Sequence, residues 1–199
     1  MGKIFCLMGK SSSGKDTIFG RIKDEFNKQL EPVTPYTTRP MRVGEVEGRE
    51  YHFISTEQLK AFEVANKVIE QRVYQTINGP WHYATIDDGQ INVMKHNYIM
   101  IVTLEAYVSL VAYFGQDYVE PIYVDVEDGI RLERALNRER QQNKPNYNEL
   151  CRRFLADNED FSIANLEKAN ITHFYVNDEL ERCITEISNA ISNTLMMNN

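Results

Sequence analysis

Cysteine is scarce in this chain of 199 residues, which has only Cys6, Cys151 and Cys183. Three scattered thiols are too few for a disulfide framework or a zinc site, and they fit a reducing compartment. Basic charge is also in deficit, because 22 Lys and Arg residues face 29 Asp and Glu residues, which leaves a net charge of −7. Since nucleic acids are bound by clustered basic surface, this balance argues against a nucleic-acid partner.

A long hydrophobic run is missing as well. The longest, Tyr98–Leu104, falls far short of the roughly 20 residues that a membrane helix needs. The N-terminus enters a strand-like run and has no signal-peptide layout. We therefore expect a soluble, cytoplasmic protein with no membrane partner. Hydrophobic residues still make up 42% of the chain, which is enough for the core of one domain.

Apolar runs alternate with helical patterns along most of the chain. Ile4–Met8 is continuously apolar and ends at Gly9, which is typical of a strand buried on both faces of a parallel sheet. A recurrence every four residues then predicts a helix that includes Ile18, Ile22, Phe26 and Leu30. Further strands are predicted at Tyr98–Leu104, Tyr118–Val124 and Ile171–Val176, and further helices at Leu150–Leu166 and Leu180–Leu195. The alternation predicts an α/β fold with a central, mostly parallel sheet and helices on both faces.

One segment, residues 33–88, breaks this alternation. Strand-like stretches at Val68–Tyr74 and Trp81–Thr85 flank a turn signal, Asn78-Gly79-Pro80. Before them, Ser55 and Gln58 have the spacing of a capping box and predict the start of a short helix. The segment is therefore expected to form a small α+β insertion on the main sheet.

A glycine-bounded polar loop follows the first strand. It reads Gly9-Lys10-Ser11-Ser12-Ser13-Gly14-Lys15, with the spacing of a phosphate-binding P-loop. Glycine allows successive N–H groups to converge on a phosphate, and Lys15 adds positive charge at the start of a helix. The position between a buried strand and an amphipathic helix is the context that this motif requires, so we expect residues 9–17 to bind a nucleotide phosphate donor.

Asp16 departs from the usual P-loop pattern. It stands where Ser or Thr normally offers a hydroxyl to magnesium, and Thr17 follows it. Asp16 could act on Mg²⁺ through water, could face away as a first-turn acid that the helix dipole favours, or could mark an altered donor site. The sequence leaves these alternatives open, with Asp16 and Thr17 as the candidate metal residues.

The most specific stretch of the chain runs from Thr37 to Phe53. Here Arg39 and Arg42 are three residues apart around a rigid proline, so both can donate to one phosphate group. Tyr51 can add a hydroxyl donor, and Glu45 can hold the guanidinium groups from behind. The stretch meets every fixed position of T-T-R-x-x-R-x-G-E-x-x-G-x-x-Y-x-F, and it thereby resembles guanylate kinase, a family of P-loop nucleoside monophosphate kinases.

The resemblance implies how an acceptor nucleotide would be bound. It matches Glu70 to the carboxylate that accepts hydrogen bonds from guanine N1–H and the exocyclic amino group. Tyr83-Ala84-Thr85 resembles the family's Y-G-[ST], in which the tyrosine contacts the acceptor phosphate and the hydroxyl contacts the base oxygen. Ala84 replaces the usual glycine, and the spacing from Glu70 to Tyr83 is longer than in the family. Glu105 is a candidate for a further acidic role, and it also fits an ordinary acid at a helix start.

Arginine is concentrated in residues 131–153, which carry six of the twelve arginines in the chain. Positive charge concentrated within an acidic chain indicates an anionic partner. By the resemblance, Arg134, Arg138 and Arg153 match the arginines of a mobile lid that covers the transferring phosphoryl group. Asn177 lies in Val176-Asn177-Asp178, which resembles a family motif near the donor base.

These parts predict one guanylate-kinase-like domain, residues 1–199. Its core would comprise residues 1–32, 89–130 and 154–199, with an acceptor-binding sub-domain at 33–88 and a helical lid at 131–153. The resemblance implies transfer of the γ-phosphate of ATP, with Mg²⁺, to GMP and also dGMP, and nucleotides as partners. Two alternatives stay open: a kinase of the same fold acting on another phosphorylated small molecule, such as a ribose bisphosphate, and a phosphopeptide-binding module without catalysis.

Overall fold

A parallel five-stranded sheet forms the centre of the protein, seen here in a computed structural model that describes residues 1–42, 44–76 and 79–197. Its strands lie in the order β2 (Leu30–Pro32), β7 (Asn97–Ile101), β1 (Ile4–Met8), β8 (Val119–Asp125) and β9 (Phe174–Val176). Each neighbouring pair is parallel. All five residues of β1 are buried, as expected for a strand that is covered on both faces.

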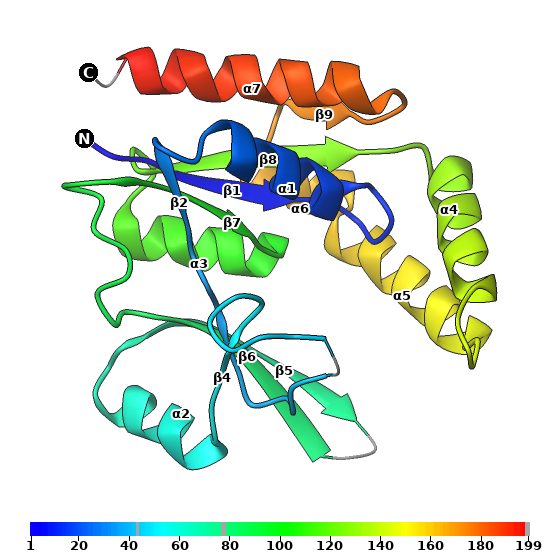
Figure 1. The fold of residues 1–199 in the computed structure, drawn as a ribbon, viewed down its shortest axis with the longest axis horizontal. Coiled ribbons are helices and arrows are strands. Elements are labelled where there is room, and N and C mark those ends of the chain that lie inside the picture. The colour runs from blue at the N-terminus through cyan, green and yellow to red at the C-terminus, as the bar shows by residue number, and fades with distance from the viewer. Residues whose placement is uncertain (43, 77–78, 198–199) are drawn as a thin grey trace.

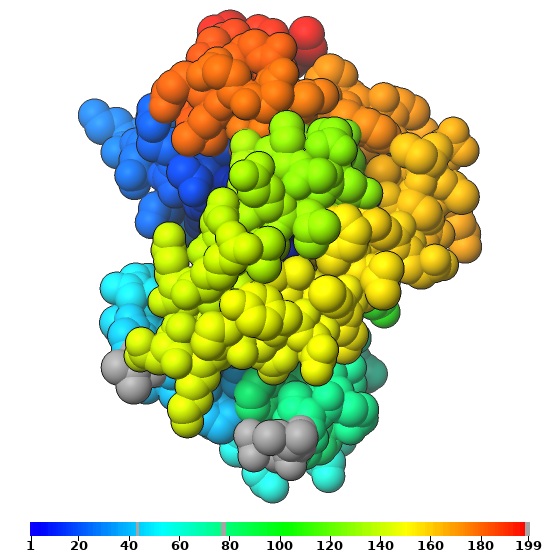
Figure 2. All heavy atoms as spheres, turned by 90° about the vertical axis from the view of Figure 1, so that its right-hand side faces the viewer, coloured from blue at the N-terminus to red at the C-terminus, as the bar shows by residue number. Residues whose placement is uncertain are grey.

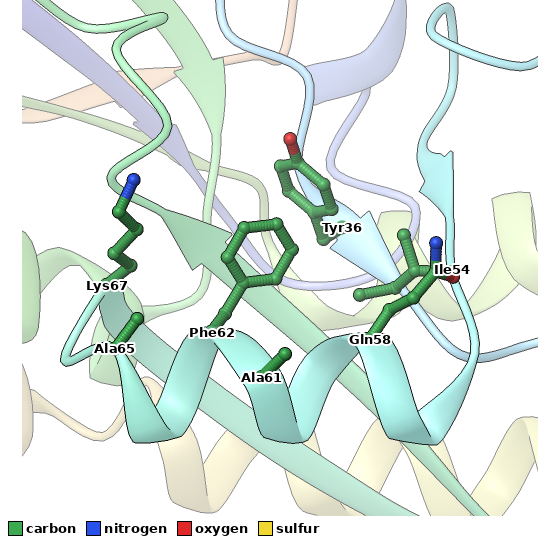
Figure 3. A pocket seen from close by; sticks show the side chains of 7 residues that line it. All are labelled: Tyr36, Ile54, Gln58, Ala61, Phe62, Ala65 and Lys67. Atoms are coloured by element: carbon green, nitrogen blue, oxygen red, sulfur yellow. The ribbon is translucent and has the colours of Figure 1, made fainter.

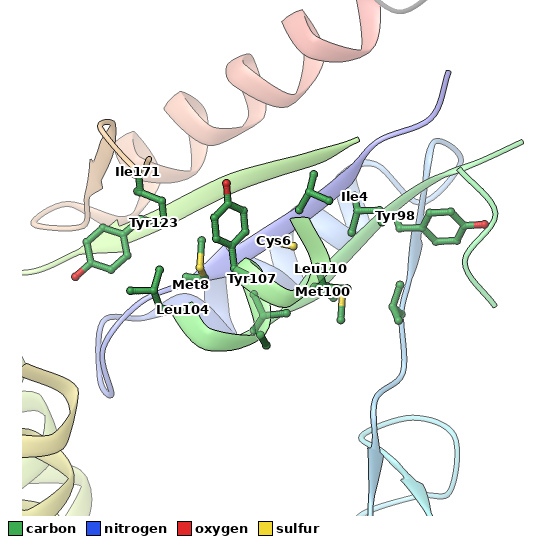
Figure 4. Packing of buried hydrophobic residues seen from close by; sticks show 14 of the residues in the cluster. Ile4, Cys6, Met8, Tyr98, Met100, Leu104, Tyr107, Leu110, Tyr123 and Ile171 are labelled. Carbon is green, nitrogen blue, oxygen red and sulfur yellow. The ribbon is translucent and has the colours of Figure 1, made fainter. Parts of the chain in front are cut away.

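Helices cover both faces of this sheet, which confirms the predicted α/β fold (Figure 1). Helices α1 (Lys15–Glu25) and α7 (Leu180–Met197) cover one face, and α3 (Leu104–Phe114) with α6 (Ile163–Lys168) covers the other. Alternate side chains of β1 divide between two cores, because Phe5 and Leu7 pack with α1 and α7 while Cys6 packs with α3. Figure 4 shows the α3 side of the sheet. Two cysteines, Cys6 and Cys183, are buried, whereas Cys151 is exposed.

A second, mixed sheet lies below the first in Figure 1. Its strands lie in the order β4 (His52–Phe53), β3 (Tyr36–Thr37), β6 (Gly79–Ile86) and β5 (Val68–Thr76). The predicted capping box is confirmed, because Ser55 and Gln58 exchange hydrogen bonds at the start of α2 (Thr56–Val64). A small core of its own joins this helix to the sheet through Leu59, Ala84 and Ile86. Val43, Asn78 of the predicted turn, and the tail at 198–199 lie outside the described residues.

Two helices project from the end of the core and lie beside the second sheet. These are α4 (Asp128–Arg140) and α5 (Tyr147–Asp160), and they carry the arginine-rich segment. In Figure 2 they cross the face turned to the viewer, drawn in yellow-green and yellow. Within the described part of the chain, no helix is both long and apolar enough to cross a membrane.

The boundaries of four predicted elements were wrong. Helix α1 ends at Glu25, and Leu30 begins β2 instead, although Leu30 still packs in the same core as Ile18. Thr103 caps α3 by accepting from the Ala106 N–H at 3.3 Å, so Leu104 begins this helix and does not end β7. The predicted helix Leu150–Leu166 is two helices, α5 and α6, because the chain turns at 161–162. Strand β9 is also shorter than predicted, since Ile171 precedes it.

Candidate active site

Close backbone packing explains the two glycines of the predicted P-loop. A Cβ on Gly9 would come within 2.6 Å of the Val124 carbonyl oxygen. Gly14 has φ +88°, and a Cβ there would come within 2.4 Å of the Asn177 side-chain nitrogen. At Gly9 a side chain would clash with backbone, and at Gly14 it would have to displace the Asn177 side chain and adopt a left-handed φ that favours glycine. The loop is thus fixed between the carboxyl end of β1 and the N-terminus of α1.

Asn177 connects this loop to the end of β8 through hydrogen bonds. Its side chain is 3% exposed, and its Nδ2 donates to the Ser13 carbonyl oxygen at 2.8 Å. Its backbone N–H donates to the Asp125 carbonyl oxygen at 2.8 Å, at the end of β8. Arg134 Nη2 donates to the Asn177 carbonyl oxygen at 3.2 Å, which connects α4 to the same position. Asn177 therefore holds the loop in shape.

The two lysines of the loop differ in their contacts. Lys10 Nζ lies 3.4 Å from an Asp128 carboxylate oxygen at the start of α4. Lys15 begins α1, and its Nζ lies 3.9 Å from an oxygen of Asp16. Asp16 and Thr17 are exposed in the first turn of α1. An acid is stabilised there by the positive end of the helix dipole, whichever of the open roles Asp16 has.

A buried arginine, which the sequence analysis did not assign to the site, joins the loop to α4 and α5. Arg131 is 1% exposed, and its Nη2 donates to Asp128 at 2.9 Å and to Asn158 at 2.8 Å. Its Nη1 lies 3.4 Å from Asp157 Oδ2, which also accepts from the Ser11 N–H at 2.7 Å. A carboxylate of α5 thus binds the backbone of the loop directly.

Two of the predicted lid arginines lie close to the same loop residue. Arg153 Nη2 donates to the Ser11 hydroxyl at 2.9 Å. Arg138 and Arg153 line a small cavity of about 60 Å³ between α4 and α5, which Ser11 also lines. The third, Arg134, turns instead toward Asn177. The structure therefore brings Arg138 and Arg153 to the predicted P-loop, with Arg134 at its side.

The predicted acceptor clamp is built around Arg39. Its side chain is 3% exposed, and two of its nitrogens donate to the two Glu45 oxygens at 2.7 and 3.0 Å. Glu45 also accepts from the Arg42 N–H at 2.7 Å, and these bonds, that of Arg39 first, lower the pKa of Glu45 to about 2. The side chain of Arg42 is exposed. Glu45 thus orients Arg39 and fixes the turn that carries Arg42.

Aromatic rings surround the Arg39 guanidinium. It lies 5.5 Å from the Tyr51 ring centroid and 5.6 Å from that of Phe53. The rings of Tyr51 and Tyr83 are also 5.5 Å apart. Burial raises the pKa of Tyr51, so its hydroxyl keeps the proton that it would donate to an anion. Both tyrosines predicted to bind the acceptor therefore lie at the clamp.

Glu70 lies on β5, which pairs in an antiparallel hairpin with β6, the strand that carries Tyr83. Glu70 is 6% exposed. The Thr85 hydroxyl donates to its Oε1 at 2.8 Å, and the two residues are cross-strand partners on β6 and β5. Arg72, which the sequence analysis missed, donates to both Glu70 oxygens, from Nε at 3.0 Å and from Nη2 at 3.3 Å. Its position two residues after Glu70 on a strand was the available signal, since such residues share a face.

Glu105 makes no hydrogen bond to Glu70 or Arg72 among the described residues. It is exposed in the first turn of α3, and its charge contributes to the raised pKa of Asp160 on α5, after burial and Asp157.

A larger cavity of about 520 Å³ lies between α2 and β3, lined mostly by apolar side chains (Figure 3). Among the described residues that line it there is no arginine and no predicted site residue.

Three comparisons with known proteins each found guanylate kinases. The family model described as guanylate kinase matches residues 1–194. A guanylate kinase of Porphyromonas gingivalis is 24% identical over 194 residues, which cover 96% of this chain and 97% of that protein. One of Shewanella denitrificans is 33% identical over 69 residues, so the match spans 35% of this chain and only 33% of the length of that relative. A crystal structure of guanylate kinase from Anaplasma phagocytophilum is also similar, and the match covers 99% of this chain and 86% of that chain. The TM-score is 0.64 and the sequence identity is 17%.

Proposed function

Because the chain belongs to the guanylate kinase family, we propose that it transfers the γ-phosphoryl group of ATP to GMP, and also to dGMP, giving ADP and the guanosine diphosphate. The proposal makes it an ATP-dependent nucleoside monophosphate kinase. It requires two anion sites, one for the donor and one for the acceptor, and a means of reading the acceptor base.

The observation that carries the proposal is the composition of one face of the β5–β6 hairpin. A buried carboxylate, Glu70, lies there with a hydroxyl donor, Thr85, at 2.8 Å. Guanine offers two adjacent donors to such a carboxylate, whereas adenine does not, so the wrong base would leave a buried charge unpaired. Arg39 and Tyr51 form a phosphate clamp beside Tyr83 of the same hairpin. A base reader and a phosphate clamp on one face suit a purine monophosphate.

Unpartnered polar atoms support a donor at the P-loop. The side-chain oxygens of Ser12, Ser13 and Asn177 are buried and have no hydrogen-bond partner among the described residues. Buried polar atoms in native proteins are normally satisfied, so a bound phosphate chain fits this loop. The residues proposed to bind ATP are the predicted set, Gly9, Lys10, Ser11, Ser12, Ser13, Gly14, Lys15, Asp16, Thr17 and Asn177.

The proposed Mg²⁺ would be held mainly by the nucleotide. This ion usually keeps several waters and binds to one or two carboxylates together with substrate phosphates. Asp16 and Thr17 are exposed in the first turn of α1, and an oxygen of Asp16 lies 3.9 Å from Lys15 Nζ. This donor set suits contact through water. Once bound, the ion would neutralise charge that develops on the phosphate oxygens.

Positioning and charge neutralisation account for the proposed transfer. The acceptor oxygen belongs to a phosphate that is already ionised at neutral pH, so no general base is needed. Lys15 of the loop and Arg134, Arg138 and Arg153 of the lid are proposed as catalytic residues that stabilise the transferring group. The Arg153 contact with Ser11 at 2.9 Å supports a lid that closes onto the donor phosphates and excludes water.

The remaining acceptor residues complete the proposal. Arg42 and Glu45 act with Arg39 on the acceptor phosphate, and Glu105 is retained as a residue near the base. The division into a core, an acceptor-binding sub-domain at 33–88 and a lid at 131–153 belongs to the same proposal. So do the cytoplasm as its compartment and nucleotides as its partners, with no role for nucleic acid, which the net charge of −7 supports.

A panel of acceptors tests this function. ADP formation from ATP and Mg²⁺ would be measured with GMP, dGMP, AMP, UMP and ribose phosphates. We expect kcat/KM for GMP to exceed that for AMP and UMP by roughly 100-fold or more. Preference for a sugar phosphate would overturn the proposed acceptor and support the second kinase hypothesis. Tight phosphopeptide binding with no transfer to any acceptor would refute the kinase function as a whole.

A further inference from the structure

Arg72 lies in the middle of the face that is proposed to bind the acceptor. Alternate residues of β5 share this face with their partners on β6, in the cross-strand pairs Glu70 with Thr85, Arg72 with Tyr83, and Tyr74 with Trp81. The rings of Tyr74 and Tyr83 are 5.5 Å apart. Arg72 therefore lies between the carboxylate proposed to read the base and the tyrosines near the phosphate clamp.

The contacts of Arg72 leave part of its hydrogen-bonding capacity unused. Nε and Nη2 each donate one hydrogen bond to Glu70, and Nη1 donates to the Thr103 hydroxyl at 3.3 Å. A guanidinium has five N–H groups. One N–H on Nη1 and one on Nη2 thus have no partner among the described residues. The side chain is only 16% exposed, so these two donors are held in a fixed direction at the base end of the site.

Thr85 leaves an acceptor on the base without a donor. A threonine hydroxyl has a single proton, and that of Thr85 is donated to Glu70 at 2.8 Å. In this arrangement Thr85 cannot also donate to the oxygen of a guanine. Arg72 and Thr85 together use three of the about four lone-pair sites of the Glu70 carboxylate, one of them at 3.3 Å, so one site is left for the N1–H of the base.

We propose that Arg72 is a specificity-determining residue that donates its two remaining N–H groups to O6 and N7 of the acceptor guanine. The inference rests on the proposed function, in which Glu70 accepts from the neighbouring N1–H. An arginine fork on O6 and N7 is the commonest specific contact to guanine in nucleic-acid recognition, because the two acceptors match the spacing of two guanidinium donors. Glu70 and Arg72 would then read two adjacent edges of one base.

The pair rejects adenine twice. Adenine has an amino group in place of O6, so that its N–H donors would face those of Arg72. It also has no N1–H for Glu70. A mismatched donor facing a buried donor leaves both unpaired, which is the condition that gives strong discrimination.

Binding measurements with three acceptors separate this role from a supporting one. Dissociation constants for GMP, IMP and AMP would be measured for the wild type, for Arg72→Met and for Arg72→Lys. IMP keeps O6, N7 and the N1–H but lacks the exocyclic amino group of GMP. We expect Arg72→Met to weaken GMP and IMP by the same factor, about tenfold or more, and not to weaken AMP. Val73→Ala, on the opposite face of β5, is the matched control and should leave all three constants unchanged.

Arg72→Lys keeps a positive charge beside Glu70 but loses the fork. We expect it to weaken GMP and IMP as Arg72→Met does, and it answers the question even if Arg72→Met does not fold. The inference would be overturned if Arg72→Lys bound GMP like the wild type. It would also be overturned if the Arg72→Met loss fell mainly on GMP, because the loss would then depend on the amino group that IMP lacks and not on O6 and N7.

A test on the unaltered protein completes the design. In 7-deaza-GMP a C–H group replaces N7, so the wild type should bind it more weakly than GMP, and this difference should disappear in Arg72→Met, which has no donor. Equal affinity of the wild type for the two nucleotides would refute the N7 contact. Failure of the proposed function is distinct from both results, because the wild type itself would then neither bind nor phosphorylate GMP.

Discussion

Replacing Lys15 by alanine should almost abolish phosphoryl transfer while leaving the fold intact. Lys15 begins α1 directly after Gly14, and among the described residues its Nζ has one ion-pair contact, to Asp16 at 3.9 Å. That partner side chain is 78% exposed, and surface pairs of this kind contribute about 0–1 kcal/mol to stability. We therefore expect the free energy of unfolding of the variant to lie within about 1 kcal/mol of the wild-type value.

The kinetic loss should be much larger than the loss of stability. A unit charge about 4 Å from a phosphate oxygen, at an effective dielectric constant near 20, contributes about 4 kcal/mol. Each 1.4 kcal/mol in the barrier corresponds to about a factor of ten in rate, so kcat/KM with ATP and GMP should fall by roughly a thousandfold. The charge acts where negative charge develops on the donor, which is why kcat should carry most of this loss.

Lys10 offers a matched control within the same loop. Its charge is already paired with Asp128 at 3.4 Å, so Lys10→Ala should reduce kcat/KM far less than Lys15→Ala does. Steady-state kinetics and denaturant unfolding of both variants would be compared. Turnover near the wild-type rate in a folded Lys15→Ala protein would refute the proposed donor site. Equal losses in the two lysine variants would refute the assignment of the catalytic charge to Lys15.

Three further predictions concern the acceptor clamp and the lid. Arg39→Ala and Arg42→Ala should each weaken GMP binding by about 1–3 kcal/mol, and unchanged dissociation constants in both variants would contradict the clamp. Arg138→Ala should lower kcat with little change in GMP affinity, because the proposed lid would reach the transferring group only on closure; a variant that loses GMP binding but keeps kcat would put Arg138 in the acceptor site. The folded-state pKa of Glu45 is about 2, against an ordinary value of 4.5. Its contribution to stability should therefore be complete above pH 4.5 and should be lost as the pH falls through 2. A carboxyl titration by NMR with a midpoint near pH 4.5 would contradict this.

Local signals in the sequence were enough for the parts of the fold that depend on neighbouring residues. The apolar run Ile4–Met8, the glycine-bounded loop and the capping box at Ser55 each combine a pattern with a short-range physical cause, and all three have the predicted structure. The helix pattern failed at Leu30 because its apolar spacing reflects packing against the core and not continuation of α1. The spacing of apolar residues indicates which of them are buried, but it does not show whether a buried residue belongs to a helix or to a strand.

Contacts between distant residues could not be predicted in the same way. Asp157 binds the Ser11 N–H across 146 positions of the chain, and Arg131 is buried although arginine is normally a surface residue. Neither position has a local signal, because the packing of α5 against the loop creates both contacts. Arg72 is an intermediate case. Its position two residues after Glu70 on a strand indicates that the two side chains share one face of the sheet, but it does not predict their hydrogen bonds.

The distribution of the three thiols has a practical consequence. Burial raises the pKa of Cys6 well above its ordinary value and raises that of Cys183 to about 11, so both stay protonated and shielded from solvent at neutral pH. Cys151 is exposed on α5, two positions before Arg153. An alkylating fluorophore applied to the native protein would therefore attach first at Cys151. The natural sequence already provides a labelling handle on a helix of the proposed lid, with which its movement on nucleotide binding can be followed without introducing a cysteine.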